Sequence, residues 1–210
     1  MILERKPLPS PARLVVVGGQ ASKVGKTSLV VDIIKAFPRQ EWAAVKISPL
    51  PNELMPAEDH SGIKAESEGP FVIQIENDRA GSTDTSRFLA AGARNSVWVR
   101  ASEDGLPSGL PALANVLRDA RYVIVESTRI AKFWAPDIFI MVFDPLRMEM
   151  KQSARDLAAL ADVFVFRSQP PERGPSDFLV TQSALCSFFQ PLGKNLPEEL
   201  QKIISSKIEV

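Results

Sequence analysis

Cysteine, histidine and long apolar runs are scarce or absent in this sequence, and each scarcity excludes a class of protein. The chain has 210 residues but a single cysteine, Cys186, which excludes an intramolecular disulfide framework and a cysteine-based zinc site. Its single histidine, His60, belongs to no apparent Ser/His/Asp arrangement or metal cluster. No apolar run approaches the ~20 residues that a membrane span needs. These features fit a reduced, cytoplasmic location without a membrane segment.

An excess of charge is also missing. Lysine and arginine number 25, as do aspartate and glutamate, so the formal net charge is zero. Proteins that bind nucleic acid or membrane surfaces typically carry a basic excess or a basic stripe, and we therefore expect neither partner. The first twelve residues contain three prolines and no continuous apolar stretch, which favours an extended lead-in over a signal peptide. Any phosphate binding must then depend on a local arrangement.

A phosphate-binding loop is the strongest motif. The apolar run 14–17 leads into two glycines, and Gly25-Lys26-Thr27 opens an apolar-rich segment that can continue as a helix. In such a P-loop, backbone N–H groups and the helix N-terminus bind phosphate oxygens. Lys26 can then reach the β- and γ-phosphates, and the Thr27 hydroxyl can hold Mg²⁺. The nucleotide site is predicted to comprise Gly19, Gln20, Ala21, Ser22, Lys23, Val24, Gly25, Lys26, Thr27 and Ser28.

The spacing of this loop differs from the common G-x-x-x-x-G-K-[ST] pattern. That pattern requires glycine at position 20, where the chain has Gln20; Gly19 lies one residue further out, so the loop is one residue longer. A glycine-rich turn is the alternative interpretation, and the strand and helix patterns on either side disfavour it. Lys23 inside the loop can contact phosphate in its own site, reach across a dimer, or be solvated.

The remaining chain alternates strand and helix patterns. Its strands are continuous β-rich runs, which is typical of a mostly parallel sheet with helices on both faces. We expect one α/β domain over residues 1–210, with a mobile, proline-rich loop at 49–70. Strands are predicted at 13–17, 42–48, 71–75, 96–100, 122–126, 138–143, 163–166 and, as a last edge strand, 178–181. Helices are predicted at 26–37, 86–93, 110–118, 153–160, 182–189 and 197–205.

Charged residues near strand ends are the candidates for further chemistry, because α/β sheets bind ligands there. Glu126 ends an apolar strand and can hold Mg²⁺ directly or through water. Lys46, near the end of the second strand, meets either a phosphate, an acid of a neighbouring strand, or water at an edge position. Asp78 and Asp84 flank a glycine; either one can be a second Mg²⁺ ligand or position a water, and turn chemistry is the alternative. A catalytic role for His60 is disfavoured.

Two stretches resemble known families. The loop 19–27 resembles that of dethiobiotin synthetase, which has the same extra residue and a similar Val-Gly-Lys-Thr ending. The block Asp78-Arg79-Ala80-Gly81-Ser82-Thr83-Asp84-Thr85-Ser86-Arg87, followed by Ala91-Gly92-Ala93, is similar to the Asp-x-x-Gly-Lys-Asp-Ser…Arg…Ala-Gly-Ala block of MobB-type proteins. These are molybdopterin-guanine dinucleotide biosynthesis accessory GTPases. The strand 123–126 and Lys46 match both families, and the resemblance covers residues 13–145.

The resemblance implies an α/β P-loop fold of the class that contains signal-recognition and MinD-type proteins (SIMIBI), whose members often work as dimers. The chain also departs from both families. Ser127 stands where the strand is expected to end in glycine, and one extra residue separates Gly81 from Asp84. The paired histidines expected after Lys46 are absent, and so is the Lys-Pro-x-x-Ser-Gly substrate loop of dethiobiotin synthetase. The MobB-like fold is therefore better supported than a role in molybdenum cofactor maturation.

The sequence thus predicts an Mg²⁺-dependent, MobB-like nucleotide-binding protein. Catalysis would involve Lys26, Asp78 and Glu126, and the metal would be held by Thr27, Glu126 and Asp78. Hydrolysis should be slow without a partner, since the loop has no obvious arginine finger. The alternatives are an ATP-dependent ligase or kinase of dethiobiotin synthetase type and a non-catalytic adaptor, with a homodimer or a protein client as partner. GTP and ATP both stay open, because no Asn-Lys-x-Asp motif occurs and the segment 167–170, which takes its place, selects neither base.

Overall fold

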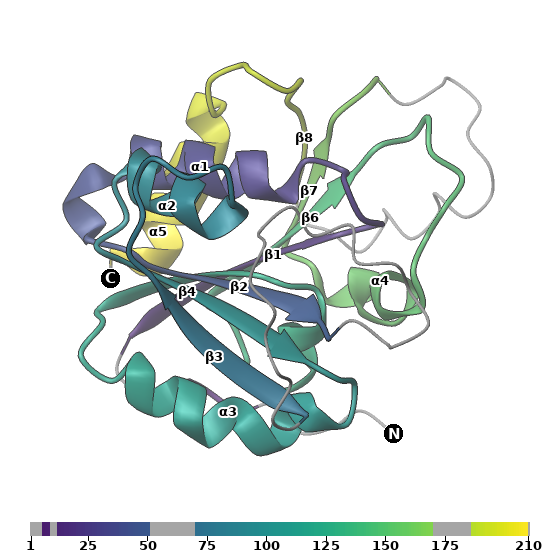
Figure 1. Cartoon of the computed structure of the whole chain (residues 1–210). Coiled ribbons are helices and arrows are strands. Elements are labelled where there is room, and N and C mark those ends of the chain that lie inside the picture. The colour runs from purple at the N-terminus through teal and green to yellow at the C-terminus, as the bar shows by residue number, and fades with distance from the viewer. Residues whose placement is uncertain (1–5, 9–11, 51–69, 170–185, 210) are drawn as a thin grey trace.

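A central sheet of eight strands carries the fold (Figure 1). The computed structural model describes residues 6–8, 12–50, 70–169 and 186–209. The strand order is β3-β4-β2-β5-β1-β6-β7-β8, and every neighbouring pair is parallel except β3 with β4. The strands are β1 (Arg13–Gly19), β2 (Ala43–Pro49), β3 (Phe71–Glu76), β4 (Asn95–Ala101), β5 (Tyr122–Glu126), β6 (Ile138–Phe143), β7 (Val163–Phe166) and β8 (Cys186–Phe189).

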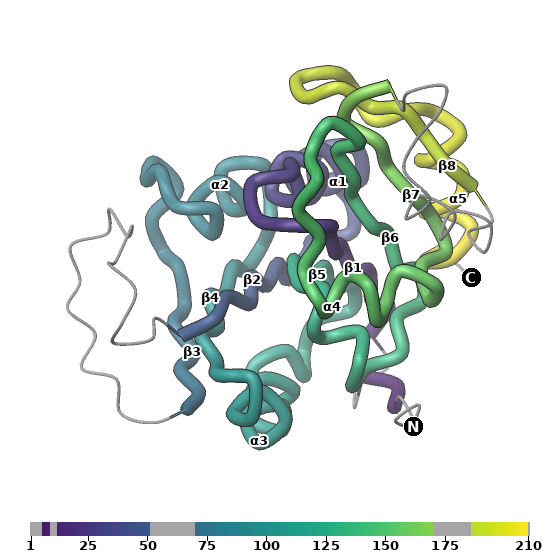
Figure 2. The backbone as a smooth tube through the Cα atoms, turned by 90° about the vertical axis from the view of Figure 1, so that its right-hand side faces the viewer, coloured from purple at the N-terminus to yellow at the C-terminus, as the bar shows by residue number. Residues whose placement is uncertain are grey.

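Helices cover both faces of the sheet. One face is packed by α1, α2 and α5, and the other by α3, α4 and two short 3₁₀ helices (Figures 1 and 2). The α-helices are α1 (Lys26–Ala36), α2 (Asp84–Ala91), α3 (Gly105–Val116), α4 (Gln152–Leu157) and α5 (Glu198–Ile208), and the 3₁₀ helices are η1 (Pro38–Gln40), η2 (Arg129–Lys132) and η3 (Ala158–Leu160). The predicted mostly parallel, two-sided α/β architecture is confirmed. None of the described helices could cross a membrane, since none is both long and apolar enough.

The first strand shows why the apolar pattern is continuous. Val15, Val16 and Val17 are all completely buried, because side chains alternate between two covered faces. Val15 and Val17 pack in the core under α1, whereas Val16 packs in the core of the opposite face. A strand that is covered on both faces therefore lacks the alternation of apolar and polar residues typical of half-exposed strands. The strands β5 and β6 show the same continuous apolar pattern.

The helix that follows the phosphate-binding loop is anchored by its apolar face. Leu29, Val30, Ile33 and Ile34 are completely buried, at the i, i+1, i+4 and i+5 positions of one wide stripe. The helix ends at Ala36, and Pro38 begins η1. This fixed helix holds the loop before it at the carboxyl end of β1.

Two predicted elements need comment. The helix predicted at 182–189 is wrong over its described part, because Cys186–Phe189 is β8 and pairs with β7 as a parallel edge strand. Its side chains alternate between half-buried and exposed, a period of two that the short run did not reveal. The helix predicted from residue 110 begins earlier, at Gly105, whose backbone N–H donates to Ser102 Oγ over 2.9 Å. The strand predicted at 178–181, most of the loop 49–70 and His60 lie outside the described residues.

Candidate functional site

The loop between β1 and α1 lies at the carboxyl edge of the sheet, where β1 is flanked by β5 and β6. Its start is fixed by Gly19, whose backbone N–H donates to Thr128 Oγ1 over 3.0 Å. Its end is Gly25, which has a φ of 93° and caps α1. A side chain at Gly25 would lie 2.9 Å from both Arg167 Nε and Leu192 Cδ2, so the position requires glycine for space as well as for backbone conformation.

Lys26 folds back over the loop. Its ammonium donates to the Ala21 carbonyl over 2.8 Å, across the space that the loop encloses. Burial lowers the pKa of Lys26; Glu126 opposes the shift, and repulsion from Lys46 and Lys151 adds to it. The Lys26 ammonium is therefore buried close to other positive charges, and a bound anion would offset their repulsion.

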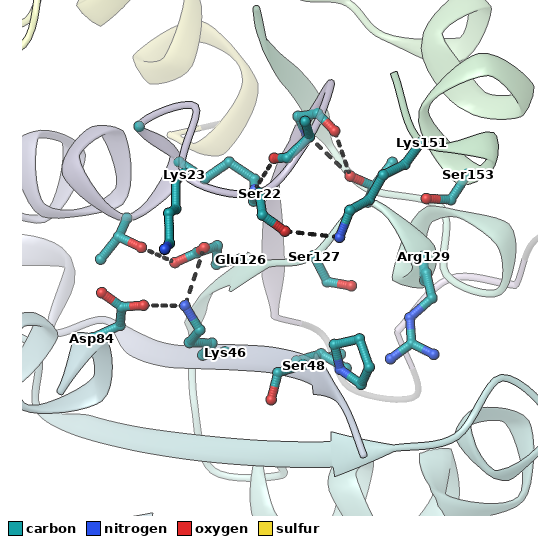
Figure 3. A pocket seen from close by; sticks show the side chains of 18 of the residues that line it. Ser22, Lys23, Lys46, Ser48, Asp84, Glu126, Ser127, Arg129, Lys151 and Ser153 are labelled. Carbon is teal, nitrogen blue, oxygen red and sulfur yellow. Dashed lines mark hydrogen bonds and ion pairs between the residues drawn. The ribbon is translucent and has the colours of Figure 1, made fainter. Parts of the chain in front are cut away.

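An ion cluster lies beside Lys26, and Figure 3 shows its side chains converging. Thr27 Oγ1 donates to Glu126 Oε2 over 2.7 Å. Lys46 Nζ lies 3.4 Å from the other oxygen, Glu126 Oε1, and forms an ion pair with Asp84. Lys46 and Glu126 are register partners on the adjacent strands β2 and β5, which is why an interior strand can carry a lysine. Burial lowers the pKa of Lys46, but attraction to Glu126 and hydrogen bonding to Asp84 outweigh burial, so the pKa is raised.

The oxygens of this cluster fit a magnesium ion. A hydroxyl from Thr27 and carboxylates from Glu126 and Asp84 are the hard donors that Mg²⁺ takes. Glu126 is almost fully buried, and the cation beside it, Lys46, shows that the cluster already favours positive charge. Mg²⁺ at nucleotide sites needs only one or two carboxylates plus phosphate and water oxygens.

The extra residue of the loop, Gln20, joins it to the segment 144–151 that follows β6. The Gln20 side chain is 4% exposed; its Nε2 donates to the Arg147 carbonyl over 2.8 Å, and its Oε1 accepts from the Asp144 N–H over 3.0 Å. Its carbonyl accepts from the Lys151 N–H over 2.9 Å. Ser22 adds two contacts, its carbonyl accepting from Arg147 Nη1 over 3.2 Å and its hydroxyl from Lys151 Nζ over 2.8 Å. We call this set of contacts the latch.

Arg167, proposed above as part of a base-contacting segment, points elsewhere. Its Nη2 donates to the Gly25 carbonyl over 2.8 Å and its Nη1 to the Gln190 carbonyl over 2.9 Å. The side chain is 8% exposed and supports the start of α1 from behind. Ser168 is likewise engaged, its hydroxyl donating to Asp144 Oδ1 over 2.8 Å. Neither residue lines the cavity described next.

A cavity of about 900 Å³ opens beside the loop (Figure 3). Its walls combine the loop with the carboxyl ends of β2, β4 and β5 and with the residues that lead into α4. The polar and charged residues that line it include Lys26, Thr27, Lys46, Ser48, Asp84, Glu126, Ser127, Arg129 and Lys151.

The structure brings together most of the residues singled out in the sequence. Of the predicted loop, all but Gln20 and Val24 line the cavity, and those two are buried behind it. Asp78 is not brought into the cavity. It is exposed, and its Oδ1 accepts from the Ala80 N–H over 2.7 Å in a turn of its own loop. Asp84, in the first turn of α2, lines the cavity and contacts Lys46, which also lies beside Glu126.

Several cavity residues were missed in the sequence. Ser48, Ser127 and Arg129 end strands or follow them directly, so a systematic reading of strand ends would have found them. Lys151 and Arg87 carry no such signal. Lys151 reaches the cavity only because the latch holds its segment against the loop.

A parallel two-sided sheet with a strand, glycine loop and helix at its carboxyl edge is the fold of the P-loop NTPases, and the chain has that fold. No family model matches the chain, and no curated protein matches it. Solved structures with similar folds include LpxK from Aquifex aeolicus in complex with ATP, with 16% identity over 94% of this chain and 77% of that one, at a TM-score of 0.47. HypB from Helicobacter pylori in complex with nickel has 10% identity over 95% of this chain and 88% of that one, also at 0.47.

Proposed function

We propose that this protein is a magnesium-dependent nucleotide-binding P-loop NTPase of MobB-like type, with GTP or ATP as ligand and a low intrinsic rate of hydrolysis. The observation that carries the proposal is the ion cluster at the end of the loop. Thr27, Glu126, Asp84 and Lys46 gather within contact of one another beside Lys26. A glycine-rich turn without a ligand would have no need of two carboxylates and two lysines at its rim.

Each residue has a distinct part in this proposal. The backbone N–H groups of the loop and the α1 N-terminus bind the phosphates, and Lys26 exchanges the Ala21 carbonyl for a phosphate oxygen. Thr27, Glu126 and Asp84 would hold Mg²⁺, which would supply positive charge against the phosphates. Lys46 keeps the two carboxylates close before any ligand arrives and is in position to meet the terminal phosphate. We assign the second carboxylate to Asp84 rather than Asp78, since only Asp84 lines the cavity.

A thermal-shift panel tests the proposal. GTP, ATP, GDP and ADP are each added with and without Mg²⁺, and the midpoint of unfolding is measured. A ligand that binds only the native state at 100 times its Kd stabilises it by about 2.7 kcal/mol. We expect a clear rise for at least one triphosphate that depends on Mg²⁺, and the panel identifies the base. No rise with any of the four nucleotides contradicts the proposal.

A variant places that binding in the loop. Lys26→Ala removes the phosphate-contacting ammonium and should abolish Mg²⁺-nucleotide binding in calorimetry. The matched control is Lys35→Ala on the same helix, because Lys35 is exposed and lies at the far end of α1. Undiminished binding of Mg²⁺-nucleotide by the Lys26 variant would contradict the proposal. Tight nucleotide binding without turnover in the wild type would favour a nucleotide-dependent adaptor. Such an adaptor would act through a homodimer or a protein client.

A second candidate is phosphate transfer to a small acceptor, as in a ligase or kinase of dethiobiotin synthetase type. The observation that favours it is the extent of the cavity, which continues past Thr27 to the ends of β2 and β4. Pure hydrolysis needs room only for water there. Rapid nucleotide turnover without any added acceptor counts against this candidate.

A further inference from the structure

The far half of the cavity is built by residues that the proposed nucleotide site does not use. It is formed by residues 48–50 at the end of β2, 101–103 at the end of β4, and 127–129 at the end of β5. Lys151 and Ser153 close it from the α4 side. The carboxyl ends of parallel strands are where α/β proteins bind their ligands, and this half presents three of them side by side.

The cavity concentrates positive charge in a chain that is neutral as a whole. Six of its lining residues are lysine or arginine and three are aspartate or glutamate. Two of the three acids, Asp84 and Glu126, are engaged with Lys46 at the proposed metal position. Bound Mg²⁺ would add positive charge to that end. The cations of the far half are therefore in excess of what the proposed nucleotide site requires.

Arg129 is the best-held of these cations. Its side chain is only 13% exposed, and its Nη2 and Nη1 donate to the carbonyls of Ala101 over 3.1 Å and Ser102 over 3.3 Å. Neutral carbonyls orient a guanidinium without cancelling its charge. Its acidic partner, Glu103, is 66% exposed and also pairs with Lys132, so water screens that attraction. The result is a fixed cation at the cavity wall whose one acidic partner is largely exposed to water.

Lys151 and Ser127 complete the arrangement from the other sides. The Lys151 ammonium donates to the neutral Ser22 hydroxyl over 2.8 Å, and Figure 3 shows it facing the same space as Ser127 and Arg129. Ser127 is 5% exposed, and it lines the same half of the cavity, where its hydroxyl can donate or accept a hydrogen bond. Pro49, Leu50 and Ala101 give the same space an apolar side.

We infer that the far half of the cavity binds a second small molecule that carries a carboxylate or phosphate group, held between Arg129 and Lys151 with Ser127 as a hydrogen-bond partner. The inference rests on the proposed function, because it places this molecule next to the terminal phosphate of a bound nucleotide. The short apolar side admits a few carbon atoms beyond the anionic group. A large polymer or a bare water molecule would not need this combination.

The test titrates small anions into protein that is already saturated with Mg²⁺ and a non-hydrolysable nucleoside triphosphate. Malonate and methylphosphonate are the probes, one for each anionic group, with ionic strength held constant by sodium chloride. The midpoint of thermal unfolding gives an apparent Kd for each probe. We expect a saturable rise with at least one of them in the wild type. Binding of malonate would indicate a carboxylate ligand, and binding of methylphosphonate would indicate a phosphate ligand.

Variants locate that binding. Arg129→Gln keeps amide donors for the two carbonyls but loses the charge, and we expect it to weaken the apparent Kd at least about tenfold. Lys151→Gln, at an exposed position, keeps a donor for the Ser22 hydroxyl but loses the charge, and it should weaken the apparent Kd similarly. Ser127→Ala should have a smaller effect, about threefold. Lys132→Gln is the matched control, since Lys132 lies on the same short helix as Arg129, pairs with the same Glu103, and does not line the cavity.

The outcomes separate this inference from the proposed function. If nucleotide stabilises the protein but neither anion produces a further saturable rise, the inference is overturned and the nucleotide site stands. The same holds if the Arg129 and Lys151 variants bind the anions as well as the Lys132 variant does. If nucleotide itself has no effect, the proposed function fails; a rise with anion alone that is lost in the Arg129 variant then still supports the site.

Discussion

Two sets of contacts around the cavity hold their side chains in different ways. In the first, which we call the carboxylate wall, Lys46, Asp84, Glu126 and Thr27 are held by ion pairs and a hydrogen bond to a carboxylate. The second is the latch, where the buried Gln20 side chain bonds to main-chain groups behind the cavity, and only the two Ser22 contacts have charged donors. The carboxylate wall should respond to metal ions and pH. The latch should respond much less to either, because most of its hydrogen bonds join neutral groups.

The two sets of contacts are suited to different functions. Charges that attract one another across a partly buried site can be redistributed when a ligand of either sign enters. Neutral hydrogen bonds with buried groups hold one geometry, and removing one partner leaves the other unsatisfied. The carboxylate wall is thus suited to binding, and the latch is suited to keeping the loop in place while binding occurs. Three experiments test whether the carboxylate wall and the latch differ in this way.

The largest effect is expected from Lys46→Met. The change leaves the carboxylates of Asp84 and Glu126 close together without their cation. We expect the free energy of unfolding to fall by about 2–3 kcal/mol, less than the 3–5 kcal/mol of a fully buried pair because the Asp84 side chain is 31% exposed. Mg²⁺ alone should restore part of the loss, which urea unfolding with and without the ion measures. An equal Mg²⁺ effect in wild type and variant would contradict a shared cation position.

The latch should give an intermediate effect that no metal ion reverses. Gln20→Ala leaves the Asp144 N–H and the Arg147 carbonyl without their partner and should lower the free energy of unfolding by about 1–3 kcal/mol. Gln40→Ala is the control, since the Gln40 hydrogen bond to Glu209 is exposed, and it should change stability by less than about 0.5 kcal/mol. If the two variants unfold alike, the latch does not stabilise the loop.

The smallest effect is a pH dependence of opposite sign at two lysines. The pKa of Lys26 is lowered in the folded protein, so its ammonium opposes folding below that pKa, and the penalty disappears as the pH rises towards its ordinary value of 10.5. We therefore expect Lys26→Met to match or exceed the wild type in stability at pH 7, by on the order of 1 kcal/mol or less, with the difference shrinking as the pH rises.

The pKa of Lys46 is raised, so its contribution is complete below 10.5 and is lost only as the pH rises beyond that value through the higher folded pKa. The stability difference between wild type and the Lys46→Met variant should therefore be constant from pH 6 to about pH 9. Urea unfolding of the three proteins across this range distinguishes the shrinking difference expected for Lys26 from the constant difference expected for Lys46. Parallel pH profiles for the two variants would show that the charges of this wall are not coupled as described.

Much of the fold could be predicted because its central strands are buried on both faces. The runs that form β1, β5 and β6 contain no polar interruption, and the strand limits of β5 and β6 were predicted to the residue. The edge of the sheet was harder. Cys186–Phe189 is four residues long and half-exposed, so neither length nor burial separates a strand from a helix there. The antiparallel direction of β3 likewise depends on chain connections that no local pattern encodes.

The candidate site shows the same contrast. Lys26, Thr27 and Glu126 follow from the loop motif and the strand-end rule. The choice between Asp78 and Asp84 depends on where α2 begins, which Thr83 decides by capping the helix through its side chain, accepting from the Ser86 N–H over 3.0 Å. Lys151 comes from a segment that the contacts of Gln20 and Ser22 hold against the loop. Long-range contacts of this kind leave no trace in residue spacing.

The hydroxyl of Ser48 connects the cavity to a natural fluorophore. Ser48 lines the cavity, and its Oγ accepts the indole N–H of Trp98 over 2.7 Å. Trp98 lies on β4 next to β2, and the Arg100 guanidinium stands over its ring at 5.0 Å. The other two tryptophans, Trp42 and Trp134, are buried and do not line the cavity. We therefore expect a ligand in the far half to change the polarity around one indole of three, so that the intrinsic emission of the protein would report binding there without a label.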